Sequence, residues 1–459
     1  MKTYKFLLTI LLLTAPAPAA AQAAQAAGGP APAKAADIDR ARFDALRKEG
    51  FGALYNLDYS GAQARFREMA KAFPDHPAGP QFLAAALWLR TLNESRRLQA
   101  SLYNTEGFYK EKDDKADPKT VAEFRELTRQ AKALCEARLK VNPNDTEALY
   151  YLGAVEGLKA AWGAMVERSF MSALSNGSDS VDRHRKVVKL DPTFHDAKIT
   201  IGMYDYVVGG LPLPVKIMAA VGGFRGSKKR GLATLEQVAR EGTWAREDAR
   251  VLLIALLKRE GRFRDAHRYA AELAASYPRN YLFKMEAADA LVSQAALDRA
   301  TAPEAAKKTE EEAFAIFESL LSARGGAGGP RVPVDLVRYS YGDALFVAGQ
   351  PERAAKEFLA AGAAPGAEAT LVTRSCLRAA QALDLAGKRD EALTHYKAVL
   401  SRPNVYDSHE EARRGLKQPF KPSGKVSDLS GDAEPAGARP GPGGRPLSRQ
   451  SSVKTKTDD

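Results

Sequence analysis

Cysteine and long apolar runs are the two features that this sequence most clearly lacks. The 459 residues include two cysteines, Cys135 and Cys376, which are too few for a disulfide framework or for a zinc site built from several thiolates. After the first few dozen positions, no run approaches the roughly 18 apolar residues that indicate a membrane-spanning helix. The sequence therefore excludes a disulfide-stapled scaffold and a polytopic membrane protein.

Catalytic and metal-binding motifs are absent as well. The six histidines form no H-E-x-x-H or H-x-H pattern and do not stand at ligand spacing from a cysteine, so we expect no metal and no cofactor. The chain has no G-x-S-x-G elbow, no G-x-G-x-x-G opening a helix and no P-loop. Both cysteines lie on apolar helical faces, which favours core thiols over nucleophiles. We therefore expect a protein that is not an enzyme.

The remaining composition is that of a large folded protein with a basic surplus. Hydrophobic residues make up 45% of the chain and charged residues 27%, and the formal net charge is +12. This is enough for the buried core of two or three domains. A chain that is disordered throughout is excluded.

Residues 1–21 have the pattern of a secretory signal peptide. Lys2 and Lys5 precede the apolar run 6–13, and small residues follow it. The alternative is an uncleaved membrane anchor, although the apolar run is shorter than the roughly 17 residues that a bilayer span needs. We expect export to the periplasm or the cell envelope, with a mature chain that begins near Gln22.

Both ends of the mature chain are too poor in apolar periodicity to form a core. Residues 22–36 consist mainly of Ala, Gly, Pro and Gln and predict a flexible leader. Residues 418–459 contain six prolines and six glycines and predict a disordered tail. The charges of this tail nearly cancel, so a solvated tail is favoured over a basic arm for polyanions.

Between these ends, a pattern of small and large residues recurs, and it is clearest in residues 341–361. Gly342 and Ala354 are small where two antiparallel helices would approach each other, Gly349 suits a left-handed turn between them, and Phe358 is large enough to fill the space behind. Two further copies have glycine at the turn and alanine five residues later, at Gly261 with Ala266 and at Gly387 with Ala392.

These three copies resemble the tetratricopeptide repeat, a helix-turn-helix unit of 34 residues. The resemblance implies an all-α solenoid of helical hairpins, which we expect to number roughly five to seven. Weaker copies before them, with helix-stopping prolines at Pro74, Pro143 and Pro192, extend the pattern towards the N-terminus with insertions. We expect lengthened N-terminal hairpins in residues 37–205, including a long first helix over 81–104, and regular repeats in residues 236–417.

The first helix of each repeat lines the concave side of such a solenoid. The resemblance places groove-facing positions six and three residues before the reference small residue and one and four residues after it. A protein or peptide partner would then meet eight candidates, Asp248, Lys258, Tyr339, Asp343, Phe346, Arg374, Gln381 and Asp384.

Residues 206–235 break the repeat pattern and form a basic connector rich in glycine and proline, without an acidic residue. A Gly-Phe, a glycine turn, a basic residue and a Gly-Leu resemble a segment of the inclusion-body clearance family of tetratricopeptide proteins, and the matching order of features covers residues 182–282. The family commonly has an acidic residue where this chain has Ser227. The matched positions are Phe224, Gly226, Lys229, Gly231 and Leu232.

Two interpretations of this connector remain open. In one, Phe224 and Ile217 plug a gap between hairpins and the cations face water. In the other, the glycine-rich turn and its cations contact an anionic lipid or glycan. The cations concerned are Lys216, Arg225, Lys228, Lys229 and Arg230.

The sequence therefore predicts an exported, non-catalytic interaction scaffold with a protein or peptide partner in its groove. The alternative function is peripheral binding to a membrane or polyanion through residues 216–232. Nucleic acid is not an expected partner.

Overall fold

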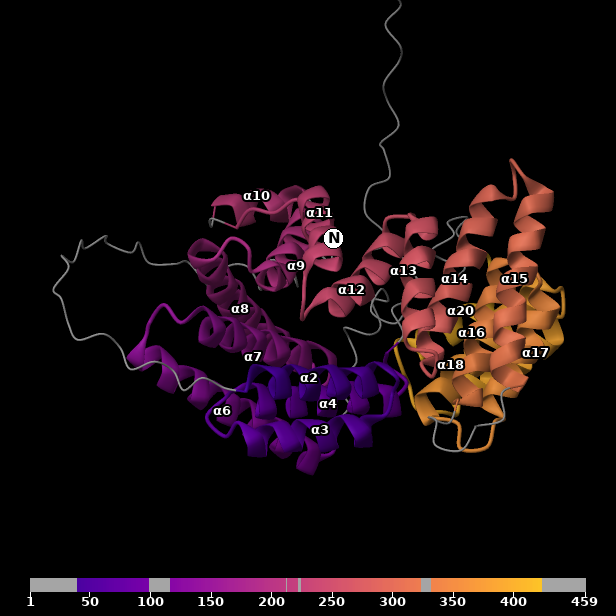
Figure 1. Cartoon of the computed structure of the whole chain (residues 1–459). Helices are drawn as coiled ribbons and strands as arrows, with labels where there is room; N and C mark the ends of the chain where they lie inside the picture. The colour runs from indigo at the N-terminus through magenta and orange to yellow at the C-terminus, as the bar shows by residue number, and fades with distance from the viewer. Residues whose placement is uncertain (1–38, 99–115, 212, 222–223, 323–331, 423–459) are drawn as a thin grey trace, which may run out of the picture.

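The computed structural model of the chain describes residues 39–98, 116–211, 213–221, 224–322 and 332–422, which are helical without a strand (Figure 1). This confirms the predicted all-α class. The predicted signal peptide, the leader of residues 22–36 and the tail from residue 423 onward lie outside these residues. Within the described ranges, no helix is long and apolar enough to cross a membrane.

Consecutive helices pack against each other as antiparallel hairpins, and the hairpins follow one another as in a tetratricopeptide-like solenoid (Figure 1). In the described residues the hairpins are α2 (Arg40–Tyr55) with α3 (Tyr59–Ala72), α4 (Ala78–Glu94) with α6 (Pro118–Val141), α7 (Thr146–Met165) with α8 (Phe170–Leu190), α9 (Lys198–Gly209) with α11 (Lys228–Glu241), α12 (Arg246–Arg259) with α13 (Phe263–Ser276), α14 (Tyr281–Asp298) with α15 (Pro303–Ser322), α16 (Val334–Val347) with α17 (Pro351–Gly362), and α18 (Ala369–Leu385) with α19 (Arg389–Leu400). Helix α20 (Ser408–Lys417) follows the last hairpin.

The lengthened N-terminal hairpins are confirmed. Helices α6, α7 and α8 have 24, 20 and 21 residues, whereas α12 and α13 have 14 each. Two details differ from the prediction. Helix α4 ends at Glu94, so the helix predicted over 81–104 stops earlier. Helices α14 and α15 are also long, with 18 and 20 residues.

Aspartate residues begin several of the N-terminal helices. In each case the side-chain carboxylate accepts a hydrogen bond from a backbone N–H of the first turn, which would otherwise lack a partner. The capping residues are Asp39, Asp58, Asp117 and Asp145. The sequence thus fixes where these helices start as well as which faces they bury.

The hairpin geometry inferred from the glycines is confirmed. A Cβ atom on Gly342 would lie 2.7 Å from the ring of Phe358, so glycine is required for this close approach of α16 and α17. The turn glycines Gly261, Gly349 and Gly387 have φ angles of 70°, 72° and 75°, which is the left-handed conformation that glycine adopts without strain.

The connector of residues 206–235 takes part in a hairpin of its own. Helices α9 and α11 cross so closely that a Cβ atom on Gly231 would lie 2.5 Å from the backbone nitrogen of Tyr206. A short helix, α10 (Leu213–Val221), runs between them along the rim of the molecule (Figure 1). With this unit the described residues form eight hairpins, one more than predicted. The glycines that break the repeat pattern here allow close helix packing.

The N-terminal hairpins lie against helices from the second half of the chain. The Tyr55 hydroxyl donates a hydrogen bond of 2.6 Å to Asp248 on α12, and the Tyr281 hydroxyl of α14 donates one of 2.8 Å to the Asn93 side chain. Arg96 forms an ion pair with Asp335 on α16. These contacts join α2 and α4 to α12, α14 and α16, so the solenoid curves back on its own beginning.

The C-terminal helix α20 covers the last hairpin, and the chain remains packed beyond it. The Phe420 backbone N–H donates a hydrogen bond of 2.8 Å to Asp384, and the Phe420 ring lies 6.0 Å from that of Phe346, centroid to centroid. Residues 418–422 were predicted as the start of the disordered tail. The prediction is wrong for this stretch because the aromatic ring of Phe420 finds an apolar partner on α16.

Candidate functional site

The predicted groove residues of α16 meet one another around a single arginine. The Arg378 guanidinium of α18 lies 4.2 Å from the centre of the Phe346 ring and 2.7 Å from the Asp343 carboxylate. Tyr339 and Phe346 are each 3% exposed. Burial raises the pKa of the Asp343 carboxyl although Arg378 lies beside it. These side chains satisfy one another and leave little surface for a partner.

The predicted groove residues of α18 are engaged in the same way. Gln381 accepts a hydrogen bond from Arg378 and donates one to Glu411 of α20. The Asp384 side chain is fully buried by Arg389, Tyr396 and the backbone of Phe420. Of this group, Arg374 stays partly accessible, with its guanidinium 4.6 Å from the centre of the Tyr339 ring.

The two candidates on α12 differ from each other. Lys258 is 8% exposed and pairs with Glu286 at 2.8 Å and Asp289 at 2.5 Å, so it stabilises the contact between α12 and α14. Asp248 lies at the other end of the helix and faces α2. Its carboxylate accepts a hydrogen bond from the Tyr55 hydroxyl, and part of the residue is exposed to water.

A pocket of about 520 Å³ lies beside α2, near Asp248 in the sequence but lined by residues that the sequence analysis did not single out. We call it the α2 pocket. It is lined by Arg40, Asp44, Arg47, Lys48, Glu147, Phe194, Thr243 and Trp244. Trp244 lies in the bend that precedes α12, outside any helix, so no helical periodicity in the sequence pointed to it.

Cations and aromatic rings meet in the α2 pocket. The Arg47 guanidinium lies 5.8 Å from the centre of the Trp244 ring, and Trp244 in turn contacts the ring of Phe194. Lys48 is exposed and makes no ion pair within the described part of the chain. The Asp196 carboxylate fixes the pocket wall by accepting hydrogen bonds from the backbone N–H groups of Thr243 and Trp244. This arrangement can hold an acidic group next to an apolar one.

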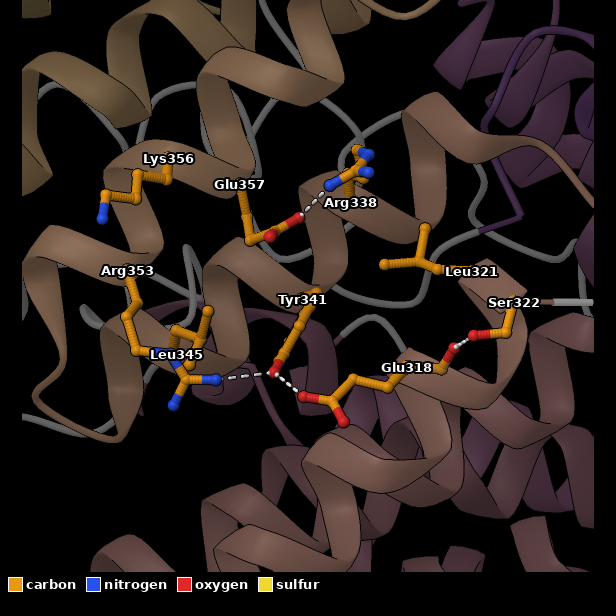
Figure 2. A pocket seen from close by; sticks show the side chains of 9 residues that line it. All are labelled: Glu318, Leu321, Ser322, Arg338, Tyr341, Leu345, Arg353, Lys356 and Glu357. Atoms are coloured by element: carbon orange, nitrogen blue, oxygen red, sulfur yellow. Dashed lines mark hydrogen bonds and ion pairs between the residues drawn. The ribbon is translucent and has the colours of Figure 1, made fainter.

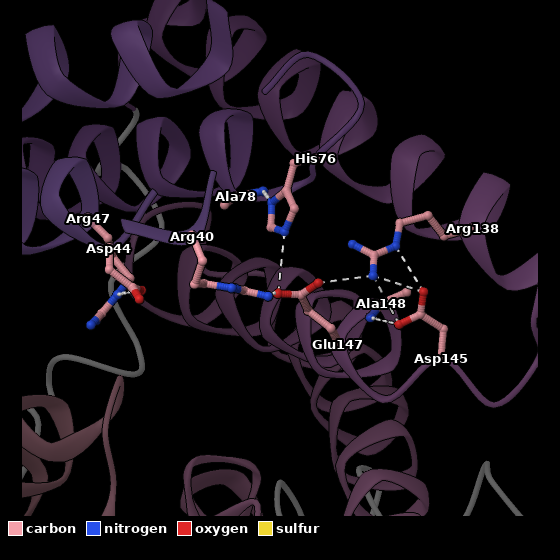
Figure 3. Close-up of polar contacts among 9 residues, drawn as sticks. All are labelled: Arg40, Asp44, Arg47, His76, Ala78, Arg138, Asp145, Glu147 and Ala148. Carbon is pink, nitrogen blue, oxygen red and sulfur yellow. Dashed lines mark hydrogen bonds and ion pairs between the residues drawn. The ribbon is translucent and has the colours of Figure 1, made fainter. Parts of the chain in front are cut away.

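Glu147 carries the main negative charge of the pocket, and three cations or donors surround it (Figure 3). It pairs with Arg40 at 3.3 Å, with Arg138 at 3.0 Å and with the His76 ring at 3.5 Å. Burial by itself would raise the pKa of Glu147, but His76 and Arg138 together lower the pKa to about 2. Glu147 is therefore fully compensated, and Arg47 pairs with Asp44 at 3.8 Å. The positive charge left for a ligand in the α2 pocket comes from Lys48, which makes no ion pair within the described residues.

Asp248 has the opposite electrostatic environment. Crowding by protein atoms limits hydration of the carboxylate and raises its pKa to about 6, against the effect of the Tyr55 hydrogen bond, and Glu247 and Asp196 raise it further. The carboxyl group thus titrates just below neutral pH at the contact between α2 and α12.

A second pocket, of about 450 Å³, lies among α15, α16 and α17 (Figure 2). The Tyr341 hydroxyl donates to Glu318 at 2.9 Å and accepts from Arg353 at 2.9 Å, while Arg338 pairs with Glu357 at 2.8 Å. Apart from Lys356, the charged groups that line this pocket are engaged with one another. Each pocket thus keeps one lysine without an ion pair among the described residues, and the α2 pocket differs by the rings of Trp244 and Phe194 beside that charge.

The basic connector keeps fewer open cations than its sequence suggests. Lys228 pairs with Glu260 at 2.6 Å, Arg230 donates a hydrogen bond of 2.6 Å to Asp205, and Lys216 donates one to the backbone oxygen of Gly209. Arg225 and Lys229 are exposed, and neither makes an ion pair with another described residue.

The packing interpretation of the connector fails at Ile217. This side chain is 57% exposed, so it does not plug a gap between hairpins as that interpretation requires. The reason is that α10 projects from the rim and makes its main contact with α9 alone.

The structure shows both cysteines buried, as expected for core thiols. Burial raises the pKa of the Cys135 thiol to about 12 and also raises that of Cys376. Cys376 lies 3.9 Å from the His395 ring nitrogen but donates its S–H to the His395 backbone oxygen. A buried thiol with a raised pKa does not form the thiolate that nucleophilic chemistry needs.

Comparisons with known proteins place the chain only at the level of fold. No protein-family model matches it, and no curated protein matches it. Among solved structures, a human IFIT1 dimer with PPP-AAAA is 14% identical with a TM-score of 0.42, and the match covers 83% of this chain and 86% of IFIT1. Yeast Tom70 is 11% identical with a TM-score of 0.35, covering 82% of this chain and 95% of Tom70. A tetratricopeptide repeat protein from Parabacteroides merdae is 13% identical with a TM-score of 0.30, covering 74% and 99%.

The fold is tetratricopeptide-like. That statement rests on the hairpins, turn glycines and close helix contacts of this chain itself, because similarity at such TM-scores carries no argument about function. A helical-repeat fold is thus what the structure establishes for the described residues.

Proposed function

We infer that the protein is a non-catalytic scaffold that binds a protein or peptide partner at the α2 pocket. The observation that carries this proposal is the open, cationic and aromatic hollow formed by Arg47, Lys48 and Trp244. The groove residues predicted from the sequence, by contrast, are largely occupied by contacts within the chain. A partner segment with an acidic side chain or a terminal carboxylate beside an apolar residue matches the chemistry of this pocket.

The place of action remains a proposal from the sequence. The signal-peptide pattern of residues 1–21 supports a scaffold exported to the periplasm or the cell envelope. Fractionation of cells that express the full chain tests it, since a protein retained in the cytoplasmic fraction with an intact N-terminus contradicts export. The more specific resemblance of residues 182–282 to the inclusion-body clearance family also stays a prediction.

The test of the binding site is capture of partners from envelope extract by the mature chain, followed by mass spectrometry. Lys48→Glu reverses the free charge of the pocket, and Thr243→Tyr narrows its mouth with a larger side chain. Both positions are exposed, so neither change should lower the melting temperature much. Lys71→Glu on α3 is the matched control, because Lys71 is also exposed and makes no ion pair among the described residues.

We expect a discrete partner that is retained by the Lys71→Glu control and lost from both pocket variants. If the pocket variants capture the same partner as the unchanged protein, the α2 pocket is not the binding site. Lys258, one of the eight groove candidates, is unsuitable for this test because its ion pairs with Glu286 and Asp289 stabilise the fold.

A further inference from the structure

Helix α10 exposes an apolar face that nothing in the described residues covers. Leu213, Ile217 and Val221 are 71%, 57% and 87% exposed, which makes them the three most exposed of the large hydrophobic side chains outside Val141. They stand at i, i+4 and i+8, so they share one side of the helix. Val207 at the end of α9 is 50% exposed and extends the apolar surface.

The position of α10 suits contact with a flat surface. The helix lies at the rim of the molecule (Figure 1), and its main packing partner is α9. Nine residues of helix extend over roughly 13 Å, which is enough to lie along an interface and too short to cross a bilayer. The geometry therefore favours shallow, lateral docking of one helical face.

The charges around α10 indicate the sign of the surface. Residues 206–235 include no acidic residue. Two carboxylates from neighbouring helices, Asp205 and Glu260, form ion pairs with Arg230 and Lys228 of the connector. Arg225 and Lys229 stay exposed without an ion pair among the described residues. The surface beside the apolar face is therefore positive, and it is complementary to an anionic one.

We propose that the apolar face of α10, with Arg225 and Lys229 beside it, docks the protein on an anionic lipid surface. The aliphatic side chains enter the interface between headgroups and acyl chains, and the two cations remain at headgroup level. This combination supplies the two signals, one apolar and one electrostatic, that reversible membrane binding usually needs. It is independent of the α2 pocket, so a scaffold docked in this way keeps its partner site free.

The proposal differs from membrane binding through the three consecutive cations Lys228, Lys229 and Arg230. Lys228 and Arg230 are held in ion pairs, so the apolar side chains must supply much of the affinity. Salt should therefore weaken binding without abolishing it, because two free cations release few counterions. Neutral vesicles should bind weakly, and anionic vesicles should bind more strongly.

The experiment is co-sedimentation of the mature chain with vesicles of phosphatidylglycerol and phosphatidylcholine, compared with phosphatidylcholine alone. Ile217→Glu together with Val221→Glu should reduce binding to the anionic vesicles by about tenfold or more, since two carboxylates cannot enter the interface. Arg225→Ser together with Lys229→Ser should reduce it by a smaller factor. Val251→Glu together with Leu297→Glu is the matched control, because these two side chains are exposed hydrophobics on α12 and α14.

A second readout follows the depth of insertion. Val221→Trp places a fluorophore at the most exposed position of α10. Its emission should shift to shorter wavelength when anionic vesicles are added. The thermal melting curves of all variants should stay close to that of the unchanged protein, because every substituted side chain is exposed.

Three results would overturn the proposal. In the first, the variant with both Ile217→Glu and Val221→Glu binds anionic vesicles as well as the unchanged protein does. In the second, the unchanged protein does not bind anionic vesicles at low salt. In the third, the emission of Val221→Trp does not shift when anionic vesicles are added. If the unchanged chain does not bind vesicles, and the variant with Ile217→Glu and Val221→Glu no longer captures a protein partner, the apolar face of α10 binds a protein instead of a membrane. Failure of the α2 pocket variants in the capture experiment leaves the membrane result unaffected.

Discussion

The inner surface at α16 and α18 differs from that at α2 and α12, although the sequence assigned binding residues to both by the same rule. At α16, Arg378 fills the space above Phe346 and Asp343, and Phe420 covers what remains. At α12, the corresponding side chain is Asp248, which accepts a hydrogen bond from Tyr55 at the end of α2. Thr243 and Trp244, just before α12, line an open pocket along α2. The position of a residue in a repeat thus determines where it points, while its neighbours determine whether a partner can reach it.

The largest expected effect is a difference in the free energy of unfolding between two alanine variants, one of Arg378 at the α16 surface and one of Arg47 at the α2 pocket. Arg378→Ala leaves the Asp343 carboxylate without its partner in a crowded site, and we expect a loss of about 3 kcal/mol in the free energy of unfolding. Arg47→Ala removes a cation–π contact with Trp244 and a partly exposed ion pair with Asp44, and it should lose about 1 kcal/mol or less. Urea denaturation of the two variants measures the difference. Equal losses would mean that the α2 pocket is as tightly packed as the α16 surface.

A second prediction opens the filled surface. Phe420→Ala removes a partly buried ring from Phe346, and we expect a loss of about 1 to 2 kcal/mol. Hydrogen exchange of the α20 amides should become faster. Leu359→Ala on α17 is the control, because this side chain is 37% exposed and its loss should be smaller. Unchanged protection of α20 would show that residues 418–422 do not hold the helix in place.

A third prediction tests whether the hairpin framework itself differs between the two regions. Gly261 and Gly387 have nearly the same positive φ angle, and a Cβ atom on either would meet no atom within 4 Å. Gly261→Ala and Gly387→Ala should each lose about 1 kcal/mol from backbone strain alone. Thermal melting should give equal shifts. Unequal shifts in melting temperature would mean that the two regions differ in their turns and not in their side chains alone.

The smallest expected effect concerns pH. The folded pKa of Asp248, about 6, is above the ordinary value of 3.8, so the fold favours the protonated carboxyl. The penalty of the ionised form is present above pH 6 and disappears as the pH falls towards 4. Asp248→Asn does not titrate. The melting temperature of the unchanged protein, measured relative to this variant, should therefore rise as the pH is lowered from 7 to 5.

The opposite end of α2 supplies the internal control for this pH effect. Glu147 has a pKa lowered to about 2 from 4.5, so its stabilising contribution is complete above pH 4.5 and is lost as the pH falls towards 2. Glu147→Gln should thus leave the change between pH 7 and pH 5 intact. A flat difference between Asp248→Asn and the unchanged protein over that window would contradict the raised pKa of Asp248.

The repeat framework could be predicted because its signals are local. Gly342, Gly349 and Phe358 lie within 17 residues of one another, and their spacing encodes the crossing and the turn of one hairpin. The contacts of Tyr55 and Arg96 join residues 193 and 239 positions apart. No periodicity carries that information, so neither the α2 pocket nor the return of the chain on itself could be inferred from the sequence.

The candidate sites show the same limit at the level of side chains. The sequence predicted the face on which Phe346 and Asp384 lie, but Phe420 comes from a segment whose composition is typical of disorder. It also grouped Lys228 and Arg230 with free cations, although Glu260 and Asp205 from other helices neutralise them. Charge partners supplied by distant helices are the part that composition cannot reveal.

The contact between the N-terminal hairpins and α12 to α16 has a consequence for the order in which the chain folds. In an open solenoid each hairpin can complete its packing as soon as the next one has been synthesised. Here Tyr55, Asn93 and Arg96 find their partners only when residues 248–335 are present. The first hairpins to emerge are therefore among the last to finish folding, and they expose their docking surface until most of the chain has been made.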